Sequence, residues 1–305
     1  MRGLKQGDPI SPYIFILCME LLSSLINKKC EDGDWDKVKA SRNGPGFSHM
    51  YFADDLLLFA KANQGNCEAI SDVLEEFNFL SGQKINKEKS KIFFSPNVSE
   101  EACVVMVQQL GINKTNNLGK YLGFPLKHKG GNRNEFQYVV DKVQAKLAGW
   151  KTKCLSPVGC LVLIKASITP ITEYTMQCYY LPTRIYDKID KLTRDFLWGS
   201  TEEKRKLHLV GWDKAIAPTN LGGLGIFQTK ARNSAILAKL CWRIALNLEA
   251  DWAKMLTNKY LTPTELSERG RRLPASHTWA ACKDGGAIFN KWLKWSISNG
   301  EAVSA

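Results

Sequence analysis

A stretch of ten residues, 51–60, constrains the fold of this chain more than any other. Its sequence, YFADDLLLFA, places two adjacent carboxylates, Asp54 and Asp55, inside an apolar run of strand-like length. Apolar residues on both sides of a polar pair predict a β-hairpin whose turn is Asp54–Asp55. Two negative charges at the edge of a packed sheet favour a bound cation. Paired divalent ions about 4 Å apart, which stabilise the entering and leaving oxygens of a phosphoryl transfer, would use this arrangement, although an isolated pair of aspartates is more often only a hairpin turn.

The residues before this hairpin predict a tight loop and then a buried helix. Glycine and proline residues in RGLKQGDP specify the loop, and Ser11 and Pro12 provide a helix N-cap and a first-turn proline. The helix, from residue 12 to about residue 26, is almost entirely apolar in its first two turns, so we expect it to be buried under a sheet. We also expect Asp54 and Asp55 to lie at the tip of a hairpin that packs on this helix.

The residues after the hairpin predict further short elements. Residues 67–81 carry apolar side chains at helical spacing, with Gly82 as a C-terminal cap, and Ser99 opens another helix. A short strand is predicted at residues 92–95, and a short hairpin at residues 119–124. Beyond it the chain is predicted to be mostly helical, with helices near 134–150, 158–179, 185–198 and 229–248.

Four segments in this order carry a resemblance to a known family: RGLKQGDPISP, YFADD, SGQKINKEKSKI and LGKYLGFPL. They resemble the consecutive palm motifs of reverse transcriptases, in the version typical of plant non-LTR (LINE-type) retrotransposons. Four ordered motifs at suitable spacing are highly specific, whereas any one of them alone is a weak signal. The resemblance extends over nearly the whole chain and is strongest over residues 2–126.

The resemblance implies an α+β fold. A partial polymerase palm, made of a hairpin and short antiparallel strands packed on helices, would precede a mostly α-helical thumb and connection region. The expected division is a partial palm at 1–126, without fingers or the first catalytic strand, a helical thumb-like region at 127–200 and a helical, basic connection region at 201–305.

The resemblance also implies a two-metal site. Asp54 and Asp55 would hold two Mg²⁺ ions together with a third aspartate, and Asp54 is the stronger candidate for direct coordination. The ions would stabilise the developing charge as the 3′-hydroxyl of a primer attacks the α-phosphate of a deoxynucleotide. The expected partners are therefore an RNA template, a DNA primer and deoxynucleotides.

Other residues receive roles from the same resemblance. Gln6 and Gly7 match the loop that positions the template and the incoming nucleotide, and the glycine would let the backbone approach the ligand. Tyr121 and Gly123 match the segment that grips the primer. Lys89 is a candidate for protonating or neutralising pyrophosphate, and a solvated lysine in a basic turn is the equal alternative for it.

The ends of the chain affect the expected activity. In the family the first catalytic aspartate lies on a strand before the RGLKQGDP loop, and this chain begins one residue before that loop. We therefore expect a chain truncated at both ends, because it also stops where longer relatives continue toward a Cys/His-rich segment. A two-metal site without its third carboxylate should polymerise DNA poorly or not at all. The alternatives are a non-catalytic nucleic-acid-binding remnant and a pseudogene product, whereas a nuclease or phosphatase would need histidines or further carboxylates near Asp54, and the sequence offers none nearby.

The charge of the chain is unevenly distributed. The net charge is +12 over 305 residues, but residues 1–150 hold 19 Lys and Arg against 17 Asp and Glu, whereas residues 151–305 hold 23 against 13. The second half is therefore the better candidate for binding a phosphate backbone. A solvated basic surface without a ligand is the alternative.

Cysteine and histidine usage bounds the remaining classes. The nine cysteines include no CxxC pair, and the chain has no signal peptide, which together favour buried free thiols in a reducing compartment. The four histidines are far apart, so no zinc site is expected. No apolar run is long enough to span a bilayer. An intracellular protein, nuclear or cytoplasmic and not secreted, is therefore expected.

Overall fold

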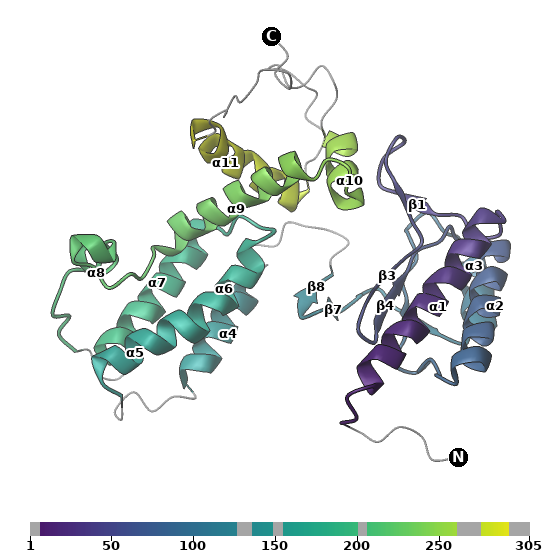
Figure 1. The fold of residues 1–305 in the computed structure, drawn as a ribbon, viewed down its shortest axis with the longest axis horizontal. Coiled ribbons are helices and arrows are strands. Elements are labelled where there is room, and N and C mark those ends of the chain that lie inside the picture. The colour runs from purple at the N-terminus through teal and green to yellow at the C-terminus, as the bar shows by residue number, and fades with distance from the viewer. Residues whose placement is uncertain (1–6, 127–135, 149–154, 201–205, 261–275, 293–305) are drawn as a thin grey trace, which may run out of the picture. The chain divides into compact units, whose positions relative to one another are not determined.

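The computed structural model describes residues 7–126, 136–148, 155–200, 206–260 and 276–292. The chain divides into two compact units, Met1–Lys129 and Gly130–Ala305 (Figure 1). Each unit has its own buried core. The first is an α+β unit, and the described part of the second is helical.

Three helices and four two-stranded sheets make up the described part of the first unit. The helices are α1 (Ser11–Glu31), α2 (Gln64–Ser81) and α3 (Glu100–Leu110). The antiparallel pairs are β1 (Val38–Lys39) with β2 (Gly46–Phe47), β3 (His49–Phe52) with β4 (Asp55–Leu58), and β7 (Lys120–Tyr121) with β8 (Phe124–Pro125); β5 (Lys91–Ile92) and β6 (Asn113–Lys114) are parallel. Figure 1 shows α1, α2 and α3 side by side, next to the β3–β4 hairpin.

Local signals in the sequence set the limits of α2 and α3. Asn63 caps α2 by accepting a hydrogen bond from the backbone N–H of Asn66 at 2.8 Å, and Gly82 ends the helix with a φ of +71°. Ser99 caps α3 in the same way through the N–H of Ala102. The predicted caps at Gly82 and Ser99 are therefore confirmed. The predicted strand at 92–95 is only partly confirmed, because β5 ends at Ile92 after two residues.

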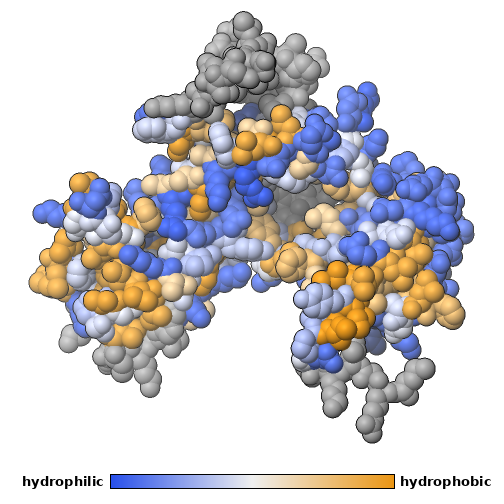
Figure 2. All heavy atoms as spheres, in the orientation of Figure 1, coloured by the Kyte–Doolittle hydropathy of each residue, from blue (hydrophilic) through white to orange (hydrophobic). Residues whose placement is uncertain are grey.

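The buried residues of helix α1 begin at Met19. Met19, Leu22 and Ile26 pack against α2, whereas Tyr13 and Leu17 keep 69% and 68% of their surface exposed. The prediction that the first two turns are buried is therefore wrong. Apolar residues occur on every side of these two turns, so the sequence pattern does not mark a buried face there. In the structure, α2 and the hairpin cover mainly the later part of the helix. Figure 2 shows apolar side chains gathered over the N-terminal half of α1.

The start of α1 also differs from the prediction. Ile10 is the N-cap and makes no side-chain cap, and Ser11 is already helical, although Pro12 lies in the first turn as expected. Asp8 takes over the capping role, because its Oδ1 accepts the N–H of Ile10 at 3.0 Å and its carbonyl accepts the N–H of Ser11 at 3.1 Å. A carboxylate at this position also suits the positive end of the helix dipole.

The second unit consists of packed helices in its described part. They are α4 (Gln137–Ala148), α5 (Pro157–Leu163), the π-helix η2 (Ile164–Ile168), α6 (Thr169–Met176), α7 (Thr183–Trp198), α8 (Trp212–Ala215), the 3₁₀-helix η3 (Thr219–Leu221), α9 (Thr229–Leu246), α10 (Asp251–Tyr260) and α11 (His277–Trp292). Helix α9 packs on α6, α7 and α11.

The predicted helix at 158–179 is interrupted by the π-turn η2. The N–H of Thr169 bonds the carbonyl of Ile164, five residues back, immediately before Pro170. Proline has no N–H and its ring crowds the preceding turn, so a widened turn at this point accommodates it. Sequence periodicity alone does not reveal such an insertion.

A buried polar side chain ties α9 to the segment between α6 and α7. Asn233 is fully buried, and its Oδ1 accepts hydrogen bonds from Tyr186 Oη at 2.8 Å and from the N–H of Leu181 at 3.1 Å. Its Nδ2 donates to the carbonyls of Met176 and Tyr179 at 3.1 and 3.0 Å. Because every polar atom of the amide is satisfied, the residue fixes the register of α9 in the unit.

Candidate active site

The β3–β4 hairpin carries both candidate metal ligands at its tip. Phe52 pairs with Asp55 and Tyr51 with Leu56, so the two turn residues are Ala53 and Asp54. The predicted hairpin is confirmed, but the predicted turn is wrong by one residue, since Asp55 begins β4. Ala53 has a φ of +51°, a conformation that costs a residue with a Cβ about 1 kcal/mol. The strand pairing therefore holds the turn in place against its local preference.

The pairing register determines which way the side chains face. Tyr51, Leu56 and Leu58 belong to one face and pack against the core of α1 and α2. Phe52 and Asp55 are cross-strand partners, so they share the opposite face, where Phe52 is 63% exposed. Asp55 therefore lies on the outer face, and Asp54 lies in the turn; both are exposed.

Two side-chain contacts anchor the hairpin on α1. The hydroxyl of Tyr51 donates to Glu20 Oε1 at 2.9 Å, and His49 Nε2 lies 2.9 Å from Ser23 Oγ. The bond to Glu20, more than burial, raises the pKa of Tyr51. Burial lowers the pKa of His49, with the charge of Lys37 adding to the effect and that of Glu20 opposing it. A neutral imidazole at this position is therefore part of the anchor.

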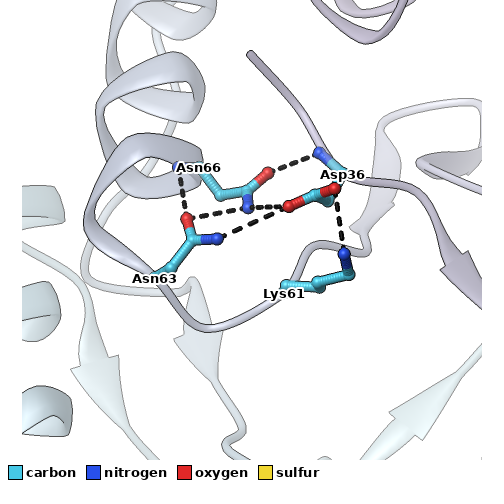
Figure 3. A network of polar contacts seen from close by, with 4 residues as sticks. All are labelled: Asp36, Lys61, Asn63 and Asn66. Atoms are coloured by element: carbon cyan, nitrogen blue, oxygen red, sulfur yellow. Dashed lines mark hydrogen bonds and ion pairs between the residues drawn. The ribbon is translucent and has the colours of Figure 1, made fainter. Parts of the chain in front are cut away.

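A second set of contacts anchors the other end of the hairpin. Trp35, almost fully buried, donates its Nε1–H to the carbonyl of Phe59 at 2.9 Å. Figure 3 shows the next residue, Asp36, pointing toward Lys61 and two asparagines. The buried Asn66 accepts the N–H of Asp36 at 2.6 Å and donates to Asp36 Oδ2 at 3.2 Å. The ion pair with Lys61, at 3.0 Å, is the main cause of a lowered pKa of Asp36. The segments before β1 and before α2 are thus fixed to each other.

Tyr121 and Gly123 lie on the second hairpin of this unit. Its turn residues, Leu122 and Gly123, have φ values of +51° and +76°, as a type I′ turn requires. Burial raises the pKa of Tyr121, and the negative charge of Asp55 raises it further. The structure therefore brings Tyr121 within electrostatic range of the candidate acids.

The remaining predicted residues are not seen to contact the acids. Gly7 is exposed with a φ of +88°, which favours glycine, and Gln6 lies outside the described residues. Lys89 is exposed in a turn in which its N–H bonds Asn86 Oδ1 at 3.0 Å. Within the described part of the chain, no contact links Gly7 or Lys89 to Asp54 or Asp55.

The donor set at the hairpin tip suits a hard cation in part. Among the residues that the structure describes, no group of three or more His, Cys, Asp or Glu could hold a metal. Mg²⁺ is often bound by one or two carboxylates, with water and substrate phosphates supplying the other oxygens. Asp54 and Asp55 therefore fit Mg²⁺ as partial ligands, whose site further oxygens complete.

Sequence reasoning missed the residues that hold the hairpin, namely Glu20, Ser23 and Trp35. A signal for two of them existed, because Glu20 and Ser23 lie three residues apart on α1 and so share one helix face. Their partners on β3 depend on tertiary packing, which the sequence pattern does not give.

The first unit is similar to a family of known proteins. The family model described as "Reverse transcriptase (RNA-dependent DNA polymerase)" matches residues 1–126. This match contains the α1 helix and both hairpins. Residues 1–126 are therefore similar to reverse transcriptases.

Individual relatives extend the similarity beyond this segment. A putative ribonuclease H protein of Arabidopsis thaliana is 38% identical over 45% of this chain and 22% of its own length. An uncharacterized mitochondrial protein of the same plant is 27% identical over 42% of the chain and 83% of its own length. A retrovirus-related Pol polyprotein from a type-2 retrotransposable element of Drosophila melanogaster is 26% identical over 74% of the chain and 21% of its own length.

These matches confirm the resemblance to reverse transcriptases of non-LTR retrotransposons. This chain corresponds to only about a fifth of the ribonuclease H protein and of the Drosophila polyprotein. No helix in the described part of the two units is long and apolar enough to cross a membrane.

Proposed function

We propose that the first unit carries part of the catalytic site of an RNA-directed DNA polymerase, with Asp54 and Asp55 as its metal ligands. The observation that carries the proposal is the anchored β3–β4 hairpin, which presents both carboxylates at an exposed tip inside the segment that matches the family. An RNA template, a DNA primer and deoxynucleotides are the proposed partners.

Each part of the unit has a proposed task in nucleotide addition. Asp54 and Asp55 would bind Mg²⁺, which supplies Lewis-acid stabilisation of the charge on the entering and leaving oxygens. Tyr121 and Gly123 would position the primer end beside these acids, an assignment that the field of Asp55 at Tyr121 supports. Gly7 and Gln6 would contact the template and nucleotide, and Lys89 would neutralise pyrophosphate.

We further propose that the 305-residue chain, by itself, adds nucleotides at a strongly reduced rate. Two adjacent carboxylates on one short segment, one in a turn and one at a strand start, supply only part of the oxygen ligands that two ions require. Weakening even the outer contacts of a metal site commonly costs about 10- to 100-fold in affinity or activity. A third oxygen ligand from another segment would be required for a full site.

Metal binding is the direct test of this proposal. The 305-residue chain is titrated with Mn²⁺, a paramagnetic stand-in for Mg²⁺, in the presence of poly(rA)–oligo(dT), and free ion is measured by electron paramagnetic resonance. Asp54→Asn should weaken binding by about 10-fold or more, because it removes a direct ligand. Asp32→Asn, at an exposed aspartate just after α1, is the matched control and should bind as the wild type does.

Deoxynucleotide incorporation on the same template separates the two parts of the proposal. Incorporation close to background is expected for the chain alone. Clear Mg²⁺-dependent incorporation that disappears in Asp54→Asn would confirm the site and contradict the reduced rate. Equal Mn²⁺ affinity in Asp54→Asn and Asp32→Asn would refute the metal site itself.

A non-catalytic role in binding nucleic acid is the second candidate, and the charge of the second half of the chain favours it. On α9, Arg232 pairs with Glu173 and Arg243 lies 5.5 Å from the ring centre of Trp252, so both are engaged within their unit. Lys230 and Lys239 on the same helix are exposed and are the better candidates for phosphate contacts. Salt-dependent binding without metal-dependent incorporation by any form of the chain would select this candidate.

A further inference from the structure

The first unit contains a groove of about 630 Å³. The residues that line it lie between 93 and 126, after the two acids in the sequence. Four segments line it: the residues that follow β5, the first turn of α3 with Glu100 and Cys103, the residues from Lys114 at the end of β6 to Leu118, and Leu126 at the end of the second hairpin. Phe93 and Phe94 contribute aromatic rings, and Leu118 and Leu126 contribute aliphatic side chains. Its size falls in the range of sites that enclose small organic molecules or single nucleotides.

The polar side chains in the groove are two amides, the hydroxyl of Ser95 and one ion pair. Asn116 and Asn117 are exposed amides in its lining. Asn117 accepts the N–H of Gly119 at 2.9 Å through Oδ1, which leaves the two N–H donors of its amide for a ligand. Lys114 is held by Glu100 at 2.5 Å, so this wall carries no net charge. The groove itself therefore suits a flat, uncharged ring with hydrogen-bonding edges.

Two lysines flank the lining segments in the sequence. Lys91 lies two residues before Phe93, and Lys120 lies two residues after Leu118. Both are exposed, and within the described residues neither has an ion-pair partner. An aromatic groove without net charge, whose lining segments are flanked in the sequence by exposed lysines, matches a nucleobase attached to its phosphates.

We propose that this groove binds an unpaired nucleobase of a single-stranded nucleic acid, with Phe94 as a stacking platform. Stacking of bases on aromatic side chains is tolerant of sequence, because every base has a flat face. An apolar peptide would leave the amides and the flanking lysines without a use. This inference goes beyond the proposed function, because base binding at the groove requires neither the acids nor metal.

The second hairpin connects this groove with the acids. Leu126 donates its N–H to the carbonyl of Gly119 at 2.9 Å, at the open end of the hairpin, whereas Tyr121 at the turn end lies in the field of Asp55. Two residues of strand separate these ends, or about 7 Å. A strand whose unpaired base occupies the groove would therefore be held close to the hairpin tip with the acids.

A fluorescent base tests this directly on the 305-residue chain. A ten-nucleotide strand with one 2-aminopurine, whose emission is quenched on stacking, is titrated at about 0.3 M salt, alone and paired with its complement. The variant Phe94→Leu keeps the apolar bulk and removes the aromatic face. It should weaken single-strand binding by about 5- to 150-fold and abolish the quench, and leave duplex binding unchanged.

Phe79→Leu is the matched control, since Phe79 is an 87% exposed ring on α2, outside the groove, and should behave as the wild type does. Circular dichroism tests whether both variants are folded. If Phe94→Leu does not fold, Asn116→Ala, at an exposed position, replaces it and should weaken binding about 2- to 10-fold. The proposal is overturned by an absence of wild-type single-strand binding, by an unchanged quench in Phe94→Leu, or by equal losses for strand and duplex. A wild-type dimer that dissociates in Phe94→Leu without nucleic acid would assign the groove to a second copy of the chain and also overturn it.

Discussion

Two adjacent glycines on α11 should respond to alanine in opposite directions. A Cβ on Gly285 would lie 2.5 Å from the backbone carbonyl carbon of Leu237 and 2.8 Å from the backbone nitrogen of Ala238, both on α9. A Cβ on Gly286 would meet no atom within 4 Å. Both positions lie inside the helix, so alanine raises helix propensity at each by about 1 kcal/mol.

The steric cost at Gly285 outweighs this gain. The clashing atoms are backbone, so no side chain can turn away and the two helices must separate. A gap of about 0.5–1 Å forfeits a quarter to a half of the dispersion energy of the contacts it opens. Overpacking of this kind typically costs about 1–3 kcal/mol. After the gain in helix propensity is subtracted, Gly285→Ala should destabilise the α9–α11 pair by up to about 2 kcal/mol, while Gly286→Ala should stabilise it by up to about 1 kcal/mol.

Amide hydrogen exchange followed by mass spectrometry suits this measurement, because a chain of two units need not unfold in one step. Exchange of peptides from α9 and α11 should accelerate by up to about 30-fold in Gly285→Ala and slow in Gly286→Ala. Peptides from α1 and α2, in the other unit, are the internal reference and should not change. Equal exchange in the two variants would refute the close helix approach on which the reasoning depends.

Three further predictions concern the hairpin and the charge. Asn66→Ala removes three side-chain hydrogen bonds and should destabilise the first unit by about 1–4 kcal/mol, against no change for the exposed Asn97→Ala, measured by exchange of β3 and β4. The pKa of His49 is lowered in the folded chain, so the contribution of His49 to stability is complete above pH 6.5, the ordinary pKa, and is lost as the pH falls below that value. Denaturation measured from pH 8 to 5 should show this loss of stability. His49→Phe should remove the part of the pH dependence that comes from His49. Duplex binding should weaken steeply between about 50 and 200 mM salt, and Lys230→Ala with Lys239→Ala should lower the slope of log K against log salt by about 2; an unchanged slope would contradict their contact with phosphate.

The sequence predicts the parts of the fold that local chemistry determines. Gly82 and Ser99 set helix ends because a left-handed residue and a hydroxyl cap act within one turn. The hairpin at 51–58 follows from apolar residues on both sides of a polar pair. Each of these features depends on neighbours in the chain, so the order of residues is enough to predict it.

The sequence does not predict features that depend on packing. The exposed first turns of α1 look like a buried helix, because apolarity does not reveal how far α2 and the hairpin extend along α1. The π-turn before Pro170 and the partners of Glu20 and Ser23 also arise only when elements meet. At the candidate site the sequence predicts the acidic residues, but it does not predict the residues that anchor their hairpin.

The one-residue shift of the hairpin turn determines how the acids are presented. Because side chains alternate between faces, a slip of one residue in β4 would turn Asp55 toward the core and Leu56 toward solvent. Leu56 and Leu58 in the core, with Tyr51 bonded to Glu20, oppose such a slip. Glycine at Ala53 would relieve about 1 kcal/mol of strain, but it would also ease alternative turns by loosening the unfolded chain. A strained turn held by an anchored strand thus keeps both carboxylates in one arrangement, as a site that positions metal ions requires.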